Sequence, residues 1–496
     1  MATRNMKLST LKTKRPLPLL TILLSSVAGL FHALDASTTA DKDTAFWNAV
    51  YSENKVLEID ISVTESSWNK MTPQNQQSGR SSFTRGRGPG GSGKSEFEYV
   101  GATIRIDGQL FENAGLRFKG NSSYRSARGG LKRPLKIDMN RFVKGQKLHG
   151  RTKFNLSNSY LDPSYMKEKL AYEVYRAAGI PTPGVGWAKV NLTIEGKVEK
   201  QPLGIYVLIE QVNQDFMNRN FGDGAKDSLL MKPENSSNWE YAGETPESYQ
   251  AYNIKIGEEN VERIKHFAAL TRIIHSGSDH MFMEEMRRRI DLKNFAAYLA
   301  TNSLLSNIDS YIGMPHNYYL FLSSTDHKLR ILPWDVNEAF GTFTMGSTPA
   351  ALTDWAIDRP WVADLTLLNR LFKDSSFRTA YQTALASLMR DTFTERKLFS
   401  RLQTFKDAIT PHLGAREKRN LEMGLEGNTY GYNAAVERQV FAIKPFIRKR
   451  IASVTAQLAG TSTGTALSGR RGGPGGRPPG RGGPGGRSRR PGPPRR

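Results

Sequence analysis

The sequence predicts a two-lobed α+β fold, with a β-rich N-terminal part and a helical C-terminal part. Short segments that alternate apolar and polar residues follow one another up to about residue 210, and apolar residues recur with the helical period beyond about residue 255. The chain of 496 residues is long enough to bury a large core. The order of its segments favours one large α+β unit over a repeat array.

Strand predictions fill the N-terminal part. The alternation of Val56–Val63 predicts the first strand, and Thr64 then begins a short helix that reaches about Met71. The Asp-Gly pair at 107–108 is typical of a hairpin turn, so the segments on either side of it are expected to pair. The other strand predictions are 99–106, 115–119, 135–139, 153–156, 185–194 and 203–210.

Helix predictions dominate the rest of the chain. Pro163 begins a helix that reaches Ala178, because Leu170 and Val174 share one face and Gly179 follows as a helix stop. One strand pair interrupts the later helices. The later helical segments are 261–274, 281–289, 292–305 and 361–458, and the strand pair is 318–322 with 329–332.

The net charge of +23 invites a partner such as nucleic acid or an anionic membrane surface. Most of that charge is local: residues 470–496 carry +9, residues 1–36 carry +4 and residues 79–95 carry +4, which leaves +6 for the rest of the chain. Such a charge is ordinary for a folded body of this size. The chain has no cysteine, which excludes disulfides, thiolate metal sites and a cysteine nucleophile.

Composition divides the chain into three parts. Residues 1–36 combine basic residues with a short apolar run, as a secretory signal peptide does, and an uncleaved anchor is the alternative. No stable membrane span is expected once this segment is cleaved. Residues 37–459 form the expected folded domain, with a Gly/Arg-rich insertion at 79–95. Residues 460–496 are rich in Gly, Pro and Arg and are expected to be disordered.

Three motif matches lack the structural context that their chemistry needs. Residues 88–95 fit the phosphate-loop pattern and 86–91 fit the dinucleotide fingerprint, yet a polar run precedes them and a strand-like run follows. Residues 460–464 fit the serine-hydrolase pattern, but within a Gly/Ser/Thr spacer. The histidines show none of the spacings typical of a zinc site.

The most informative segment is 307–341. It places Asp309 after a predicted helix, Asn317 at the start of a strand and Asp335 just after the returning strand. Because a hairpin brings its two ends together, Asn317 and Asp335 are expected to share a divalent cation, with Asp309 close by. A separate Asp beside a bound nucleotide is what phosphoryl transfer uses to orient the attacking hydroxyl. The alternative is two capping residues and a surface acid.

At these residues the chain resembles the spore coat protein H (CotH) kinase family. The resemblance covers roughly residues 55–455 and rests on several motifs in the family's order. The family implies an atypical, secreted, protein-kinase-like fold that uses ATP and a divalent metal, Mg²⁺ or Mn²⁺. The matching segments are the hairpin 104–117, RFKGNSS at 117–123, RPLKI at 133–137, KFNLSNSYLDPSYMKEKLAYEVYRAAGIPTP at 153–183, PLGIYVLIEQVNQDFM at 202–217, NIDSYIGMPHNYYLF at 307–321, PWDVNEAFG at 333–341 and WVADLTLLNRLFKDSSFR at 361–378.

The resemblance implies roles for the residues of the hairpin segment. Asp309 is the expected catalytic acid/base, and Asn317 and Asp335 are the expected metal ligands. Lys136, on a strand of the N-terminal part, is the expected phosphate-contacting lysine, and an exposed strand cation is the alternative.

The resemblance also implies further nucleotide-binding residues. Glu210 and Val212 follow an apolar strand at the position where a kinase offers backbone groups to adenine, and pairing of Glu210 with a phosphate-binding lysine is the alternative. On the 163–178 helix, Lys169 matches the family better than Glu168 does. The remaining expected nucleotide-binding residues are Arg117, Lys119 and Asn121.

The expected function is transfer of the ATP γ-phosphate to a Ser or Thr hydroxyl of a protein substrate, by a secreted or cell-surface enzyme. Two alternatives stay open. One is a non-catalytic surface or coat-assembly protein on the same fold. The other is a polyanion-binding wall protein that acts through its Arg/Gly segments, with a weak polyanion contact by the tail.

Overall fold

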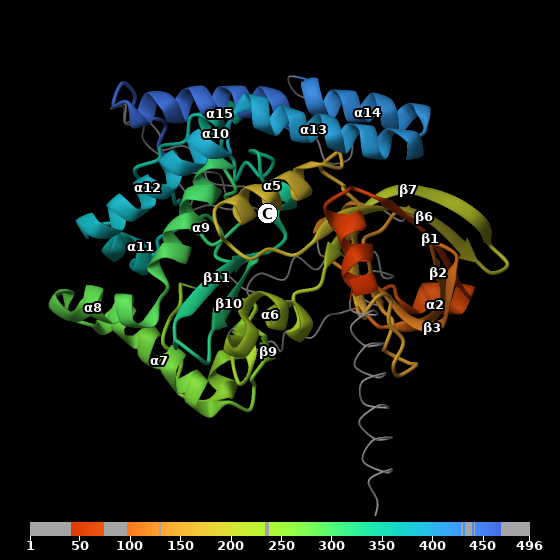
Figure 1. Ribbon diagram of the computed structural model, residues 1–496, viewed down its shortest axis with the longest axis horizontal. Coiled ribbons are helices and arrows are strands. Elements are labelled where there is room, and N and C mark those ends of the chain that lie inside the picture. Colours follow the sequence, from red (N-terminus) through yellow and green to blue (C-terminus); the bar gives the residue numbers. More distant parts are fainter. Residues whose placement is uncertain are drawn as a thin grey trace, which may run out of the picture.

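The structure, a computed structural model, describes residues 41–73, 97–120, 122–127, 130–233, 238–427, 430–431, 439–440 and 442–467. Helices account for 44% and strands for 20% of the fold, which confirms the predicted α+β class. The strands come first and most helices follow (Figure 1). The predictions for 1–36, the 79–95 insertion, Asn121 and the tail beyond 467 lie outside the described residues.

Seven strands of the N-terminal part close into a barrel, in the order β1-β2-β3-β4-β5-β7-β6. Neighbouring strands are antiparallel, except that β6 lies parallel to β1 and closes the barrel. Alternate residues along β1 and β2 are buried, so one face of each strand fills the barrel interior. The bounds are β1 Val56–Val63, β2 Val100–Ile106, β3 Gln109–Phe118, β4 Leu135–Asp138, β5 Lys153–Ser157, β6 Val185–Ile194 and β7 Val198–Glu210.

A second sheet lies within the helical part and has the order β11-β10-β8-β9. The sequence predicted its hairpin, β10 (Tyr318–Leu322) with β11 (Leu329–Pro333). It did not predict β8 (Leu229–Met231) or β9 (Ile254–Ile256), because three residues are too few to show an alternating pattern. These two strands extend the hairpin into a sheet, and β8 pairs directly with β10.

Helices cover this second sheet. Figure 1 shows α13, α14 and α15 side by side along the edge above α5, in agreement with the contacts among them. The central helix α9 is buried on nearly all sides and packs against α12 and β11. The bounds are α2 Glu65–Lys70, α4 Ser122–Ser126, α5 Lys167–Ala177, α6 Gln214–Phe221, α7 Val261–Ser276, α8 Asp279–Arg289, α9 Leu292–Leu304, α10 Pro349–Thr353, α11 Thr366–Leu371, α12 Ser375–Asp391, α13 Glu395–Ile409, α14 Ala415–Glu426 and α15 Ile443–Leu458.

Helix α5 begins at Lys167, whereas the sequence predicted a start at Pro163. The buried carboxylate of Asp162 accepts hydrogen bonds from the backbone N–H groups of Ser164 (3.0 Å) and Lys167 (2.8 Å). Tyr165 has a left-handed φ of 61°, which is incompatible with a continuing helix. A side-chain-bonded turn therefore replaces the first predicted helical turn.

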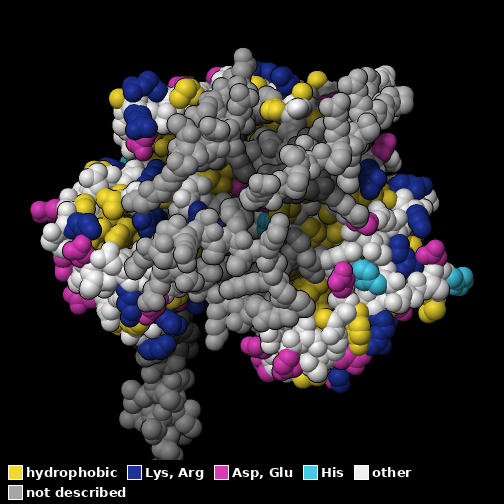
Figure 2. All heavy atoms as spheres, turned by 180° about the vertical axis from the view of Figure 1, so that it is seen from behind, with side chains coloured by type: hydrophobic (Ala, Val, Ile, Leu, Met, Phe, Trp, Pro, Cys, Tyr) yellow, Lys and Arg dark blue, Asp and Glu magenta, His cyan; other side chains and the backbone are white. Residues whose placement is uncertain are grey.

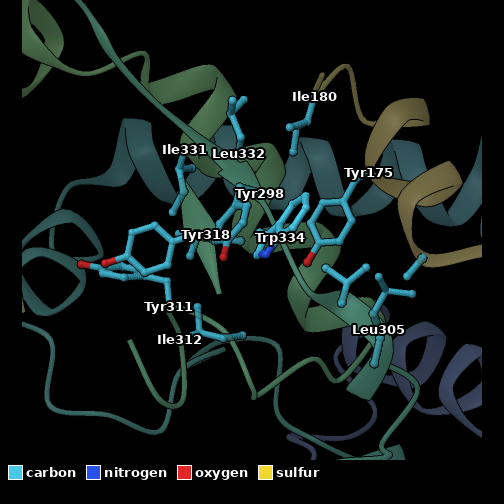
Figure 3. Close-up of a cluster of buried hydrophobic side chains, with 14 of the residues drawn as sticks. Tyr175, Ile180, Tyr298, Leu305, Tyr311, Ile312, Tyr318, Ile331, Leu332 and Trp334 are labelled. Carbon is cyan, nitrogen blue, oxygen red and sulfur yellow. The ribbon is translucent and has the colours of Figure 1, made fainter. Parts of the chain in front are cut away.

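The buried hydrophobic residues form two clusters. One fills the barrel, and the other lies among the helices and the second sheet. Figure 3 shows tyrosines of the second cluster, including Tyr298, Tyr311 and Tyr318, beside Trp334. The Tyr318 hydroxyl keeps a hydrogen bond inside the core, because the Trp239 indole N–H donates to it at 2.9 Å.

Basic and acidic side chains share the surface of the described residues. On the face in Figure 2, Lys and Arg side chains are interspersed with Asp and Glu. The helices of the described residues include none with the length and hydropathy to span a bilayer.

The ordered body extends past the predicted start of the tail at residue 460. The backbone of Thr465 bonds to that of Asp354 (2.7 Å) and Ala356 (3.0 Å), and its hydroxyl donates to the Asp354 carboxylate at 2.7 Å. The prediction that disorder begins at 460 is therefore wrong, because backbone pairing of Thr465 fixes the segment up to residue 467 against the 354–356 loop.

Candidate active site

The β10–β11 hairpin brings two of the predicted site residues to one end. Tyr318 pairs with Pro333, and the backbone N–H of Trp334 donates to the carbonyl oxygen of Asn317 at 3.2 Å. Asn317 directly precedes β10 and Asp335 directly follows Trp334, so both flank this end of the hairpin. Both have a left-handed φ, 59° and 55°, which Asn and Asp adopt more readily than other side-chain-bearing residues.

Asp309 is held beside Asn317. The Asn317 side-chain amide donates to the Asp309 carboxylate at 2.9 Å and to its backbone carbonyl at 3.0 Å. The other carboxylate oxygen of Asp309, Oδ1, lies 3.0 Å from Nε2 of His316. The Asp309 side chain is 15% exposed. The amide group of Asn317 uses only its nitrogen in these bonds, so its oxygen stays available for a cation.

Asp335 faces the first turns of α5. Its backbone N–H donates to the Tyr172 hydroxyl at 3.1 Å. Asn337, with its amide turned so that the nitrogen faces Asp335, donates to the Asp335 carboxylate at 3.3 Å. Burial, and next the charge of Asp335, raise the pKa of Glu168 to about 8. The Oε1 atom of Glu168 is buried with no hydrogen-bond partner among the described residues.

Lys119 links this acidic group to the barrel. It follows β3, and its ammonium lies 5.8 Å from the centre of the Trp334 ring. Burial lowers the pKa of Lys119, and the charges of Asp335 and Glu168 act in the opposite direction. Lys119, Glu168 and Asp335 therefore form one electrostatic cluster, although no ion pair between Lys119 and either acid is present in the described structure.

Lys136 lies in a second, basic cluster. Its ammonium donates to the Gln211 side-chain oxygen at 2.6 Å. Burial, followed by the charges of the surrounding cations, lowers the pKa of Lys136 well below its usual value. One neutral amide oxygen is a weak counterpart for the Lys136 ammonium among these cations, so the position of Lys136 is suited to an added anion. The surrounding cations are Arg117, Lys119, Lys153 and Lys232.

The two faces of α5 separate Glu168 from Lys169. Glu168 and Tyr172, four residues apart, both lie toward Asp335. Lys169 points elsewhere: its ammonium donates to the backbone carbonyls of Tyr51 (2.7 Å) and Val185 (2.6 Å). Lys169 is therefore used in holding α5 against the barrel, and the structure does not bring it to the other predicted residues.

Glu210 is also engaged away from the cations of the Lys136 cluster. Its carboxylate pairs with Arg219 and lies 3.1 Å from Arg151, and it accepts the backbone N–H of Gly184 at 2.9 Å. The alternative in which Glu210 pairs with a phosphate-binding lysine has no support in these contacts. Glu210 instead joins the end of β7 to the start of the helical part.

Residues 211–213 connect the barrel to the helical part. Val212 is buried as a whole residue, with 2% of its surface exposed. Gln211 lies between this connection and the basic cluster, because its oxygen accepts from Lys136 and its nitrogen donates to the Val212 carbonyl at 3.0 Å. The Arg117 guanidinium stacks over the Tyr99 ring at 5.1 Å.

Sequence reasoning missed several residues of this region. Glu168 was passed over in favour of Lys169, although the helical period places Glu168 on the same face as Tyr172. No local pattern marks Gln211, His316 or Lys232, which join the site only through tertiary packing.

Two cavities lie along α5, and one of them borders the site. A narrow one, of about 10 Å³, lies between Glu168 and Asn337. A larger one, of about 440 Å³, lies between α5 and α13, is lined by Leu170, Val174 and Leu398 among others, and includes none of the predicted site residues. Within the described residues, no group of three or more acids or histidines is arranged to hold a metal ion.

The arrangement combines a basic part, around Lys136, with an oxygen-rich part. Asp335 and Asn317 offer two oxygen ligands, which is too few for a protein-only metal site but suits Mg²⁺ or Mn²⁺ that also binds phosphate oxygens and water. The cations around Lys136 suit those phosphates. The residue types present thus suit a metal–nucleotide complex, and Asp309 lies beside Asn317.

Comparison with known proteins identifies the family of this chain. The family model described as "CotH kinase protein" matches residues 116–454. The chain is 25% identical to the "Inner spore coat protein H" of Bacillus subtilis (strain 168) over 276 residues, 54% of this chain and 71% of that protein. It is 24% identical over 238 residues to an "Inner spore coat protein H-like protein" of the same organism, covering 48% of this chain and 61% of that protein. Since the family model matches well over half of its length, the chain belongs to the CotH kinase protein family.

Proposed function

We propose that this protein is an exported atypical kinase that transfers the ATP γ-phosphate to a Ser or Thr hydroxyl of a protein. The observation that carries the proposal is the position of Lys119. It interacts both with the cations around Lys136 and with the acids Glu168 and Asp335. A triphosphate held by the cations would therefore extend toward the carboxylate of Asp335, where a metal ion is needed.

The basic cluster would neutralise the triphosphate. Lys136 and Lys119 would contact its oxygens, and Arg117 and Lys153 would add positive charge nearby. The Val212 backbone would meet the adenine ring, with Gln211 joining this contact to Lys136. Glu168 would face Lys119 as a mostly protonated carboxyl at neutral pH, because burial and the charge of Asp335 raise its pKa to about 8.

Asp335 and Asn317 would hold Mg²⁺ or Mn²⁺, which when bound lowers the negative charge on the transferred phosphoryl group. Asp309 would orient the acceptor hydroxyl through its carboxylate. In the transfer, a bond forms between the hydroxyl oxygen and the γ-phosphorus, the bond from that phosphorus to the bridging oxygen of ADP breaks, and the hydroxyl proton moves to Asp309. His316 and Asn317 fix the carboxylate for this role.

We also propose the two-lobed, kinase-like organisation that the sequence predicts. The separate hydrophobic clusters of the barrel and of the helical part support it. So does the connection at residues 211–213, where β7 of the barrel leads into α6. On this proposal the nucleotide binds between the two parts.

Transfer of ³²P from labelled ATP, with Mn²⁺ or Mg²⁺, tests the proposed activity. Asp309→Asn and Asp335→Asn should each lower incorporation at least about 100-fold, because each removes a charge that acts in the transition state. Asp223→Asn, at an acid that is 80% exposed, is the matched control and should transfer as the wild type does. Equal incorporation by all four proteins would show that these acids do not act in transfer.

The names of the relatives favour a second candidate, a coat or surface assembly protein on the same fold. The same residues would then bind a nucleotide without transferring phosphate. Nucleotide binding that is lost in Asp335→Asn, together with no ³²P incorporation by the wild type on any coat or surface protein offered, would favour this candidate.

A coat or cell-surface location, reached through the N-terminal signal, is part of the proposal. We further propose a weak polyanion contact by the tail, because residues 470–496 carry +9. A chain that ends at residue 469 should bind nucleic acid or anionic wall polymer more weakly, and with a smaller dependence on salt, than the full chain. Unchanged binding would show that the tail plays no part in it.

A further inference from the structure

The turn between β4 and β5 presents two neighbouring apolar side chains to solvent. Phe142 is 44% exposed and Val143 is 36% exposed. Single exposed apolar residues are ordinary on protein surfaces, whereas these two are adjacent in the sequence. We define the segment 141–147 as the basic–apolar turn.

The basic–apolar turn is fixed in shape. The Asn140 side chain accepts the backbone N–H of Gly145 at 2.6 Å, and the left-handed φ of Gly145, 84°, closes the turn without strain. At its far end, the Gln146 side chain donates to the Glu112 carbonyl of β3 at 2.8 Å. At its near end, the Arg141 guanidinium lies 5.2 Å from the centre of the Tyr99 ring. The apolar pair is therefore presented by a rigid base.

Cations surround the apolar pair. Arg141, Lys144 and Lys147 are all exposed, and the described structure pairs none of the three with an acid. Two acids lie on the neighbouring strands: Glu112 on β3, whose backbone carbonyl accepts from the Gln146 side chain, and Asp138 at the end of β4, which pairs with Lys153. The turn itself carries three positive charges and no negative one.

This combination selects one kind of surface. Lys and Arg gain energy beside anionic headgroups, and Phe and Val gain energy by entering the interface between headgroups and acyl chains. A soluble polyanion would satisfy the cations but give the apolar pair nothing. We propose that the basic–apolar turn docks the protein, reversibly, on an anionic lipid surface, independently of the proposed transfer activity.

Vesicle binding by the full chain tests the docking. The probe is a vesicle of mixed phosphatidylglycerol and phosphatidylcholine, compared with one of phosphatidylcholine alone. The double variant Phe142→Ser, Val143→Ser keeps every charge and should lower the fraction bound to anionic vesicles at least about tenfold. Met423→Ser, at a side chain of matching exposure (45%) on α14, should bind as the wild type does. Both variants change exposed residues, and equal melting temperatures check that both remain folded.

A fluorescent label separates the turn from other basic segments. The chain has no cysteine, so Val143→Cys and Met423→Cys each provide one attachment point for an environment-sensitive dye. The dye at position 143 should shift to the blue with anionic vesicles, and the dye at 423 should not. Vesicle binding without a shift at 143 would assign the binding to another segment and overturn the proposal. The proposal would also be overturned if the dye at position 143 gave the same blue shift without vesicles. Equal vesicle binding by the wild type and the double variant would overturn it as well.

Discussion

Glu168 is a buried acid whose charge depends on its surroundings. Burial and Asp335 raise its pKa from 4.5 to about 8 in the folded protein, whereas in the unfolded chain it keeps the ordinary value. The folded protein therefore binds this proton more tightly. The resulting stabilisation is complete below about pH 4.5 and is lost as the pH rises through about 8.

Replacing Glu168 with Gln should remove this pH dependence. The wild type should lose stability as the pH rises, and Glu168→Gln should not. The difference in the free energy of unfolding, variant minus wild type, should therefore increase by at least about 1 kcal/mol between about pH 5 and pH 9. Denaturant unfolding of both proteins at several pH values measures it. Glu199→Gln, at an exposed position on β7, is the control and should run parallel to the wild type. A constant difference for Glu168→Gln would show that Glu168 is already ionised at neutral pH.

Sequence patterns predicted which site residues meet at the ends of the hairpin, but not which side chain of α5 faces the site. The hairpin that follows Asn317 and returns to Asp335 is local, so its ends could be placed together from the sequence. The choice of Lys169 over Glu168 depended on which face of α5 meets the second sheet. That face is decided by contacts with residues far along the chain, such as the bond from Asp335 to Tyr172.

Among the helices, α15 is joined to the core by a buried charge. The Arg450 guanidinium donates to the backbone carbonyls of Trp355 (2.6 Å), Thr353 (3.3 Å) and Ser303 (3.0 Å). Burial lowers its pKa to about 10. Through these bonds Arg450 ties α15 to the end of α9, the helix that leads to Asp309.

A lysine ammonium cannot replace the two guanidinium nitrogens with which Arg450 reaches three separate carbonyl groups. Arg450→Lys should lower the free energy of unfolding by about 2–4 kcal/mol, because carbonyl groups inside the core lose their partners. Urea unfolding measures the change, and Arg448→Lys, two residues earlier on the half-exposed side of α15, should cost less than about 1 kcal/mol. A loss as small for Arg450→Lys as for Arg448→Lys would mean that water reaches these carbonyls.

Elements with a long, clear period were predicted well. The bounds of β1 and β6 agree with the structure residue for residue. Elements decided by side-chain bonds or by distant partners were not: α5 starts late because Asp162 caps a turn, and β8 becomes a strand only because β10 lies beside it.

At the scale of the whole molecule, closure of the barrel depends on strands that are far apart in the sequence. The barrel closes where β1 meets β6, which the chain reaches only after four intervening strands, and no local pattern specifies that parallel pairing. The same closure places β3, β4 and β5 so that Arg117, Lys136 and Lys153 share one basic cluster. The net charge of +23 is thus less informative than the position of a few of its lysines.

A crystal structure with Mn²⁺ and a non-hydrolysable ATP analogue is the most direct test of the proposed site. Anomalous scattering locates the Mn²⁺ independently of the nucleotide. The account predicts Mn²⁺ bound by the Asp335 carboxylate and the Asn317 amide oxygen, and a triphosphate in contact with Lys119 and Lys136. A nucleotide in the 440 Å³ cavity between α5 and α13, or Mn²⁺ bound away from Asp335, would contradict it.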